Sequence, residues 1–205
     1  MKIIYEYKEA RFSLQEVYSY KDRKEYLITS VDKSSETLFL PSEANGHDVI
    51  GFAFPSLSYY GDREKYDHSY PFVKKIVIPS KYRRMDSLNN LVFPCLEEIR
   101  IEAGNSEYWT DGKMLYKKGG EILCLSMGEG MREGTVIIPD SVKKIGSDAF
   151  QYTVCKEVVF ENPDVVVDYH AFDHSVWLDK SIYRQHLVQS SIFRFIYIKT
   201  GYFEN

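Results

Sequence analysis

The sequence lacks a long apolar run, so nothing in it predicts a membrane span or a secretory signal. Its first residues, MKIIYEYKEAR, carry charges at Glu6, Lys8, Glu9 and Arg11, where a secretory signal needs an unbroken apolar segment. No stretch approaches the ~20 apolar residues that cross a bilayer. We therefore expect a soluble, cytoplasmic protein without membrane insertion, or a surface or secreted protein if a leader has been removed.

Cysteine is scarce, with three residues in a chain of 205. Cys95, Cys124 and Cys155 are an odd number with no close pair, which argues against a disulfide framework and against a CxxC metal or redox site. We expect Cys124 and Cys155 to act as small buried hydrophobic residues.

Concentrated basic charge and catalytic motifs are also missing. The formal net charge is −4 and basic pairs are scattered among acids, whereas a nucleic-acid-binding face gathers Lys and Arg in one patch. The sequence contains no phosphate-binding loop, no glycine-rich dinucleotide fingerprint and no GxSxG elbow. We therefore expect no nucleic-acid partner, no cofactor, no metal and no catalytic residues, and we predict that the protein is not an enzyme.

The sequence does contain an internal repeat. TVIIPDSVKKIGSDAF (135–150) aligns with EVVFENPDVVVDYHAF (157–172) at a shift of 22 residues, and both segments end in Ala-Phe. Further copies begin at KIVIP (75–79) and at EIRIEAGN (98–105), and the earliest, TLFLPSEANGHDVIGFAF (37–54), ends in the same Ala-Phe. Such units bury their apolar faces only by stacking, so five copies predict a solenoid.

Each unit centres on an apolar–x–apolar pair. Because side chains alternate along a strand, both apolar side chains of a pair point to one face. The pairs are Leu38/Leu40, Ile76/Ile78, Ile99/Ile101, Val136/Ile138 and Val158/Phe160. Pro41, Pro79 and Pro139 follow three of these strands and end the ladder, because proline has no N–H to donate.

The second half of each unit returns one side chain to the interior. Met85, Ile145 and Val167 occupy this second apolar position. Gly51 and Gly146 are expected to supply tight bends of the backbone. In the Ala-Phe pair, we expect the small residue to let neighbouring coils approach and the aromatic ring to fill the interior.

The strings VIIPDSVKKIGSDAF and LFLPSEANGHDVIGFAF resemble the BspA-type leucine-rich repeat, whose consensus runs IP-x-x-V-x-x-IG-x-x-AF. The stretch 105–126 is similar to the hairpin insertion that these proteins carry between repeats. The resemblance covers about residues 26–172. It implies a right-handed solenoid used for protein–protein contact, adhesion or surface binding, and it transfers no catalytic residues. In the last repeat, Glu161 replaces the proline and Asp168 the glycine, which indicates a degenerate terminal coil.

The predicted fold is therefore mostly β with an α/β-type repeat. We expect a right-handed leucine-rich-repeat solenoid of about five coils with β caps and a hairpin insertion. The expected parts are an N-terminal β cap (1–36), the solenoid (37–172, with insertions at 55–72 and 103–134) and a C-terminal cap (173–205). Asp111-Gly112, inside the second insertion, is a strong hairpin signal.

The outer face of the repeat strands is the first candidate binding surface. In each unit, the residue between the two core positions points outward. These residues are Phe39, Val77, Arg100, Ile137 and Val159. Four of the five are apolar and are expected to stack into one stripe, and contiguous exposed apolar surface commonly marks an interaction site. The alternatives are that these residues are simply good strand formers, or that a cap or the hairpin covers them.

The second candidate is an aromatic rim in the insertions. Its residues are Tyr59, Tyr60, Tyr66, Tyr70, Tyr108 and Trp109. Tyrosine-rich loops suit contact with protein or sugar, because the ring is apolar and its hydroxyl is polar. The alternative is that these rings only pack their insertions against the solenoid.

His170 and His174 stand four residues apart, a spacing that on a helix can place two imidazoles on a metal. The Ala-Phe pair between them belongs to the repeat, and no third His or Cys follows at a zinc-like spacing, so we interpret them as surface residues of the last coil.

The predicted function is a non-catalytic binding or scaffolding protein with a protein partner that the sequence does not identify. The alternative is a carbohydrate-binding or carbohydrate-active β solenoid with a glycan partner, because parallel β solenoids can host glycan-cleaving carboxylates.

Overall fold

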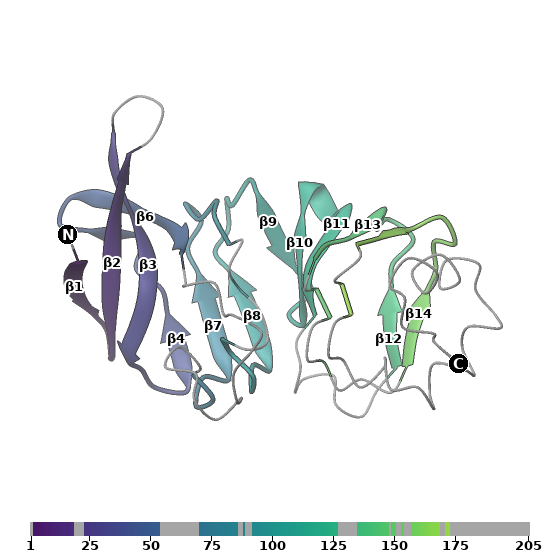
Figure 1. Cartoon of the computed structure of the whole chain (residues 1–205), viewed down its shortest axis with the longest axis horizontal. Coiled ribbons are helices and arrows are strands. Elements are labelled where there is room, and N and C mark those ends of the chain that lie inside the picture. Colours follow the sequence, from purple (N-terminus) through teal and green to yellow (C-terminus); the bar gives the residue numbers. More distant parts are fainter. Residues whose placement is uncertain are drawn as a thin grey trace, which may run out of the picture.

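Short strands dominate the computed structural model, which describes residues 2–18, 23–53, 70–85, 88, 92–126, 135–147, 149–150, 153, 157–168 and 171–172. In this part of the chain there is no α-helix, and the one 3₁₀ turn, η2, spans Lys118–Gly120. No helix there is long and apolar enough to span a membrane. The strands form a β solenoid of about 4 turns (Figure 1).

An antiparallel sheet covers the start of the solenoid. It contains β1 (Lys2–Tyr7), β2 (Ala10–Tyr18) and β3 (Lys24–Lys33), which pair antiparallel in this order. On its other side, β3 pairs in parallel with β6 (His47–Phe52). The short β5 (Glu43–Ala44) pairs antiparallel with β6 at the edge of the sheet. Phe12 and Leu14 of β2 are fully buried in the same core as the first repeat strand. The N-terminal strands therefore cap the solenoid.

The repeat strands stack in parallel, as the apolar–x–apolar pattern predicts. β4 (Thr37–Phe39), β7 (Lys75–Ile78) and β8 (Glu98–Ile101) form one sheet, and β12 (Thr135–Ile138) and β14 (Glu157–Phe160) form another. The first core positions pair across neighbouring strands, Leu38 with Ile76 and Ile76 with Ile99. All three side chains are buried, which confirms the predicted inward face.

A second row of short parallel strand pairs forms in the second half of each coil, after the repeat strand. β13 (Lys144–Ile145) pairs with β15 (Val166–Val167) on one side and with β11 (Ile122–Ser126) on the other. In the N-terminal half, the corresponding contact is a parallel bridge between Gly51 and Arg84.

The hairpin replaces the return of one coil. β9 (Tyr108–Thr110), β10 (Met114–Lys117) and β11 are antiparallel, and Leu123 of β11 takes the position next to Ile145. After β8 the chain enters this hairpin instead of returning as an ordinary coil. The five repeat strands thus belong to a solenoid of about 4 turns, close to the predicted number of about five coils.

The hairpin also separates two hydrophobic cores. Leu115 and Leu125 pack into the N-terminal core, which extends from the cap to β8. Met114, Tyr116 and Leu123 pack into the C-terminal core around β12–β15. Because side chains alternate along a strand, the neighbours Leu115 and Tyr116 face different cores. The hairpin is therefore a layer shared by both halves of the solenoid (Figure 1).

The Ala-Phe pairs have the predicted role. Ala149 and Ala171 are fully buried, and the rings of Phe150 and Phe172 stack with centroids 4.6 Å apart and an interplanar angle of 13°. The amide of Phe150 donates to the carbonyl oxygen of Ala171 at 2.7 Å, a contact that a larger side chain would hinder.

Several predictions fall outside the described residues. They concern the C-terminal cap, most of the first insertion, Cys155, and the pair His170 and His174. Cys124, which the structure does describe, is partly buried and packs against the N-terminal core.

Candidate binding surface

The outward residues of the first three repeat strands lie side by side. Phe39 pairs with Val77 and Val77 with Arg100, in register across β4, β7 and β8. Phe39 and Val77 are half-buried, and Arg100 is exposed. We call these three residues the N-terminal patch.

The N-terminal cap covers one end of this patch. The ammonium of Lys8 lies 3.5 Å from the centroid of the Phe39 ring, within the range of a cation–π interaction. Lys8 occupies the turn between β1 and β2, with a φ of 52°. One predicted alternative, that a cap covers part of the apolar face, therefore holds for Phe39.

Ion pairs occupy the other end of the N-terminal patch. The ammonium of Lys75 lies 3.1 Å from the carboxylate of Glu98, which also accepts a hydrogen bond from the guanidinium of Arg100. These hydrogen bonds, from Arg100 first and then from Lys75, lower the pKa of Glu98 against the opposing effect of desolvation. The exposed part of this patch is thus charged at neutral pH and not apolar.

The two outward residues of the second sheet are apolar and exposed. Ile137 of β12 pairs in register with Val159 of β14, and their side chains are 54% and 40% exposed. Val136 and Val158, one residue earlier on the same strands, are buried. We call Ile137 and Val159 the C-terminal patch.

The five outward residues do not form the single stripe that we predicted. Among the described strands, β8 and β12 belong to separate sheets, and the chain between them contains the β9–β11 hairpin. The hairpin packs between the two cores and interrupts the parallel ladder. The sheet face consists of two separate patches: the exposed part of the N-terminal patch is charged, and the C-terminal patch is apolar.

The aromatic rim is only partly present as predicted. Tyr70 and Tyr108 are buried, and their hydroxyl oxygens accept backbone N–H groups from Val31 at 2.9 Å and from Met85 at 3.1 Å. Their assignment to a contact rim is wrong, because each ring fastens its segment to the solenoid. Tyr59, Tyr60 and Tyr66 lie outside the described residues.

Trp109 remains available for contact. Its side chain is 38% exposed, and its indole stacks on the ring of Tyr116 with centroids 4.5 Å apart. The hydroxyl of Tyr116 donates to the carboxylate of Asp111 at 3.0 Å, and burial together with this carboxylate raises the pKa of Tyr116. One exposed indole is thus held on a rigid, buried ring.

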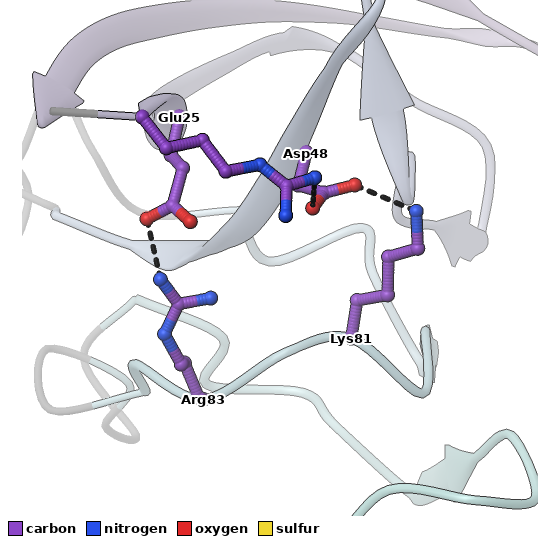
Figure 2. Close-up of polar contacts among 5 residues, drawn as sticks. Glu25, Asp48, Lys81 and Arg83 are labelled. Atoms are coloured by element: carbon purple, nitrogen blue, oxygen red, sulfur yellow. Dashed lines mark hydrogen bonds and ion pairs between the residues drawn. The ribbon is translucent and has the colours of Figure 1, made fainter. Parts of the chain in front are cut away.

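Figure 2 shows a cluster of charged residues between the N-terminal sheet and the segment that follows β7. This cluster was not predicted from the sequence. Asp48 of β6 accepts from Lys81 and from Arg23, each at 2.6 Å. Glu25 of β3 is buried and pairs with Arg83. These pairs join residues 25, 33 and 58 positions apart, so no local pattern in the sequence could reveal them.

The charged cluster favours the ionised form of the Asp48 carboxylate. The hydrogen bond from Lys81, and the nearby charges of Lys81, Arg23 and Arg83, lower the pKa of Asp48 against the opposing effect of desolvation. Glu25 of β3 and Asp48 of β6 each pair with a cation from the segment that follows β7, namely Arg83 and Lys81. These ion pairs therefore stabilise the packing of the N-terminal sheet against that segment.

Metal-ligating side chains do not gather in the part of the chain that the structure describes. No three residues among His, Cys, Asp and Glu lie together there as a metal site would require. His47 instead contacts the edge of the Tyr26 ring, with centroids 5.8 Å apart.

Comparison with known proteins gives structural neighbours only. The chain matches no protein-family model and no curated protein sequence. A leucine-rich repeat protein from Eubacterium ventriosum is 26% identical over 46% of this chain, with a TM-score of 0.41. A leucine-rich cell-surface protein from Faecalibacterium prausnitzii is 15% identical over 84%, with a TM-score of 0.41. The pneumococcal vaccine antigen PcpA is 12% identical over 82%, with a TM-score of 0.35.

One neighbour is a leucine-rich repeat protein, one is a leucine-rich cell-surface protein and one is a vaccine antigen. The chain covers 25% of the E. ventriosum protein, 46% of the F. prausnitzii protein and 67% of PcpA. The solenoid architecture of this chain rests on its own strand pairing.

Proposed function

We propose that this protein is a non-catalytic binding protein that contacts a protein partner through the outer face of its repeat strands. The observation that carries the proposal is the C-terminal patch. Ile137 and Val159 are adjacent in register and exposed, whereas the core positions beside them on the same strands are buried. Apolar side chains that are paired and open to solvent lose water favourably when a partner covers them.

The N-terminal patch complements this contact with charge. Arg100, Glu98 and Lys75 form a short row of ion pairs on exposed sheet surface. Exposed charges of this kind add little affinity, but they select partners and orient them. We propose that the apolar C-terminal patch supplies most of the affinity and that the N-terminal patch selects the partner.

The resemblance of the repeats to the BspA type supports this proposal and adds surface display to it. Sequence motifs shared with that family imply contact with other proteins at a surface, and they imply no catalytic residues. The repeat strands of this chain have the inward and outward alternation that such a contact face needs.

The experiment is a quantitative pull-down from cells and culture medium of the source organism. The baits are the native chain, an Ile137→Lys/Val159→Lys double variant and a Val166→Lys control. Val166 is also exposed, at 62%, but lies on β15 in the returning row and not on the repeat face. We expect a partner that the native chain and the control retain and that the double variant loses. Retention of the same partner by the double variant would refute the proposed face.

A glycan is the second candidate ligand, because Trp109 presents an exposed indole on the buried ring of Tyr116. A flat, rigid aromatic surface suits the apolar face of a sugar ring. Binding to a glycan array that is lost on Trp109→Ala, and unchanged in the Ile137→Lys/Val159→Lys variant, would favour this candidate over the protein partner.

A further inference from the structure

The outermost strand of the N-terminal sheet has an unpaired side. In the sheet order β1-β2-β3-β6-β5, β1 pairs with β2 on one side, and no other strand of the described chain lies along its outer side. An outer strand presents unpaired N–H and C=O groups, to which another strand can add.

The two faces of β1 differ in character. Ile3, Tyr5 and Tyr7 are half-buried and pack against the N-terminal core. Lys2, Ile4 and Glu6 are exposed, and the side chain of Ile4 is 52% exposed. The exposed face therefore carries a cation, an isoleucine and an anion in a row.

This row is complementary to itself. When a second copy of β1 pairs antiparallel about a two-fold axis at Ile4, Lys2 of each copy opposes Glu6 of the other. Ile4 opposes Ile4, and Ile3 opposes Tyr5 on the opposite face. Oppositely charged pairs and aromatic–β-branched pairs are the cross-strand combinations that stabilise antiparallel sheets.

Other two-fold registers are less favourable. Directly opposed residues share a face of the sheet, so the axis must pass through a residue and not between two residues. An axis at Ile3 places Lys2 opposite Ile4, and an axis at Tyr5 places Glu6 opposite Ile4. The register at Ile3 pairs fewer residues of β1 than the register at Ile4, the register at Tyr5 pairs the same number, and both set a charge against an isoleucine.

Glu6 can accept the second cation without losing its first. Both hydrogen bonds from Arg11 end on Oε1 of Glu6, at 3.0 and 2.8 Å. Neither Oε2 of Glu6 nor the ammonium of Lys2 has an ion-pair partner within the described residues. The carboxylate can therefore bridge Arg11 of its own chain and Lys2 of the second copy.

We propose that two copies of this chain associate through β1, antiparallel and centred on Ile4, to form one continuous sheet across a two-fold axis. The contact is isologous, so each Lys2–Glu6 pair occurs twice. It lies on the cap and uses no residue of the N-terminal or C-terminal patch.

The test is a charge exchange followed by sedimentation velocity over a series of concentrations. The native chain is expected to shift from monomer to dimer as its concentration rises. In a dimer of the Lys2→Glu variant, two carboxylates oppose each other at both Lys2–Glu6 sites, and in a dimer of the Glu6→Lys variant two ammonium groups do. Each variant alone is therefore expected to dimerise about tenfold more weakly. In an equimolar mixture, a heterodimer of the two variants sets an anion opposite a cation at both sites, so it is expected to form near native affinity.

Two controls separate this contact from effects on folding. Arg11→Ala removes the partner of Glu6 within the chain and should leave dimerisation nearly native, whereas Ile4→Lys should abolish it. Thermal unfolding of each variant reports whether the cap still folds. A second measurement follows amide hydrogen exchange in residues 2–7, which should slow as the native concentration rises.

The outcomes are distinct. A native chain that stays monomeric at all concentrations, single variants that dimerise like the native chain, or a mixture that fails to associate would each overturn the proposal. These results are independent of the pull-down with the Ile137→Lys/Val159→Lys variant. The proposed dimer and the proposed binding face can therefore be refuted separately.

Discussion

A side chain at Gly51 would collide with the backbone of Arg84. A Cβ placed at Gly51 would lie 1.7 Å from the carbonyl oxygen of Arg84, and the φ of Gly51 is +150°. The amide of Phe52 donates to that same oxygen at 2.8 Å. Gly51 therefore allows two neighbouring coils to approach to hydrogen-bonding distance.

Gly51→Ala is expected to destabilise the protein by about 3 kcal/mol or more, because either the coils separate or the Phe52 hydrogen bond is lost. Gly46→Ala is the matched control. Gly46 also has a positive φ, of +77°, but no atom lies within 4 Å of an added Cβ, so only the strain of about 1 kcal/mol remains. Urea unfolding of both variants compares the two costs, and equal costs would contradict the collision.

Tyr108→Phe is expected to cost about 1–3 kcal/mol of stability. The hydroxyl of Tyr108 is the acceptor for the buried amide of Met85, and its removal leaves that N–H without a partner. Tyr18→Phe is the control, since Tyr18 is exposed on β2. A thermal shift for Tyr108→Phe no larger than for Tyr18→Phe would show that the hydroxyl does not fasten the second coil.

Asp48 should make stability depend on acid pH. Its pKa is lowered in the folded state, mainly by the hydrogen bond from Lys81, so its contribution is complete above the unfolded pKa of about 3.9. The contribution is lost as pH falls through the folded pKa. We expect Asp48→Asn to cost about 1 kcal/mol at neutral pH, because the cationic partners are partly exposed.

Urea unfolding across the acid range measures this dependence. The native chain and Asp48→Asn should converge in stability as pH falls, and high salt should reduce their difference at neutral pH. Asp164→Asn, at an exposed position, is the control for removal of a surface aspartate. A difference between native and Asp48→Asn that stays constant down to low pH would exclude the ion pairs as its cause.

The hairpin should respond differently to substitutions at two adjacent residues. Leu115→Ala opens a cavity in the N-terminal core, and Tyr116→Ala opens one in the C-terminal core, each at a cost of about 2–5 kcal/mol. Hydrogen exchange should quicken mainly in β7 and β8 for Leu115→Ala, and mainly in β12 and β13 for Tyr116→Ala. The same pattern of exchange in both variants would mean that the two cores unfold as one unit.

The repeat could be predicted because it is local. Alternating pairs such as Ile76/Ile78 and Val136/Ile138 decide which side of a strand is buried, and the structure confirms both. The role of the Ala-Phe ending could be predicted in the same way, and Ala149 and Ala171 are both fully buried.

The fate of the candidate site residues could not be predicted in the same way. Phe39 and Ile137 occupy equivalent places in their units, yet Lys8 covers Phe39 and Ile137 is exposed. Tyr108 and Trp109 are neighbours in one strand, yet the first is buried and the second is partly exposed. Whether these side chains are exposed depends on which segments, distant in the sequence, pack over them.

The repeat unit, its inward face and the stacking of coils could be predicted from the sequence alone, because they follow from spacings of a few residues and from the chemistry of Pro, Gly and Ala-Phe. The division of the sheet face by the hairpin, the contact of Lys8 with Phe39 and the ion pair of Asp48 with Lys81 became evident only in the folded structure. Such contacts join residues far apart in the chain, and their geometry is fixed only when whole coils pack together.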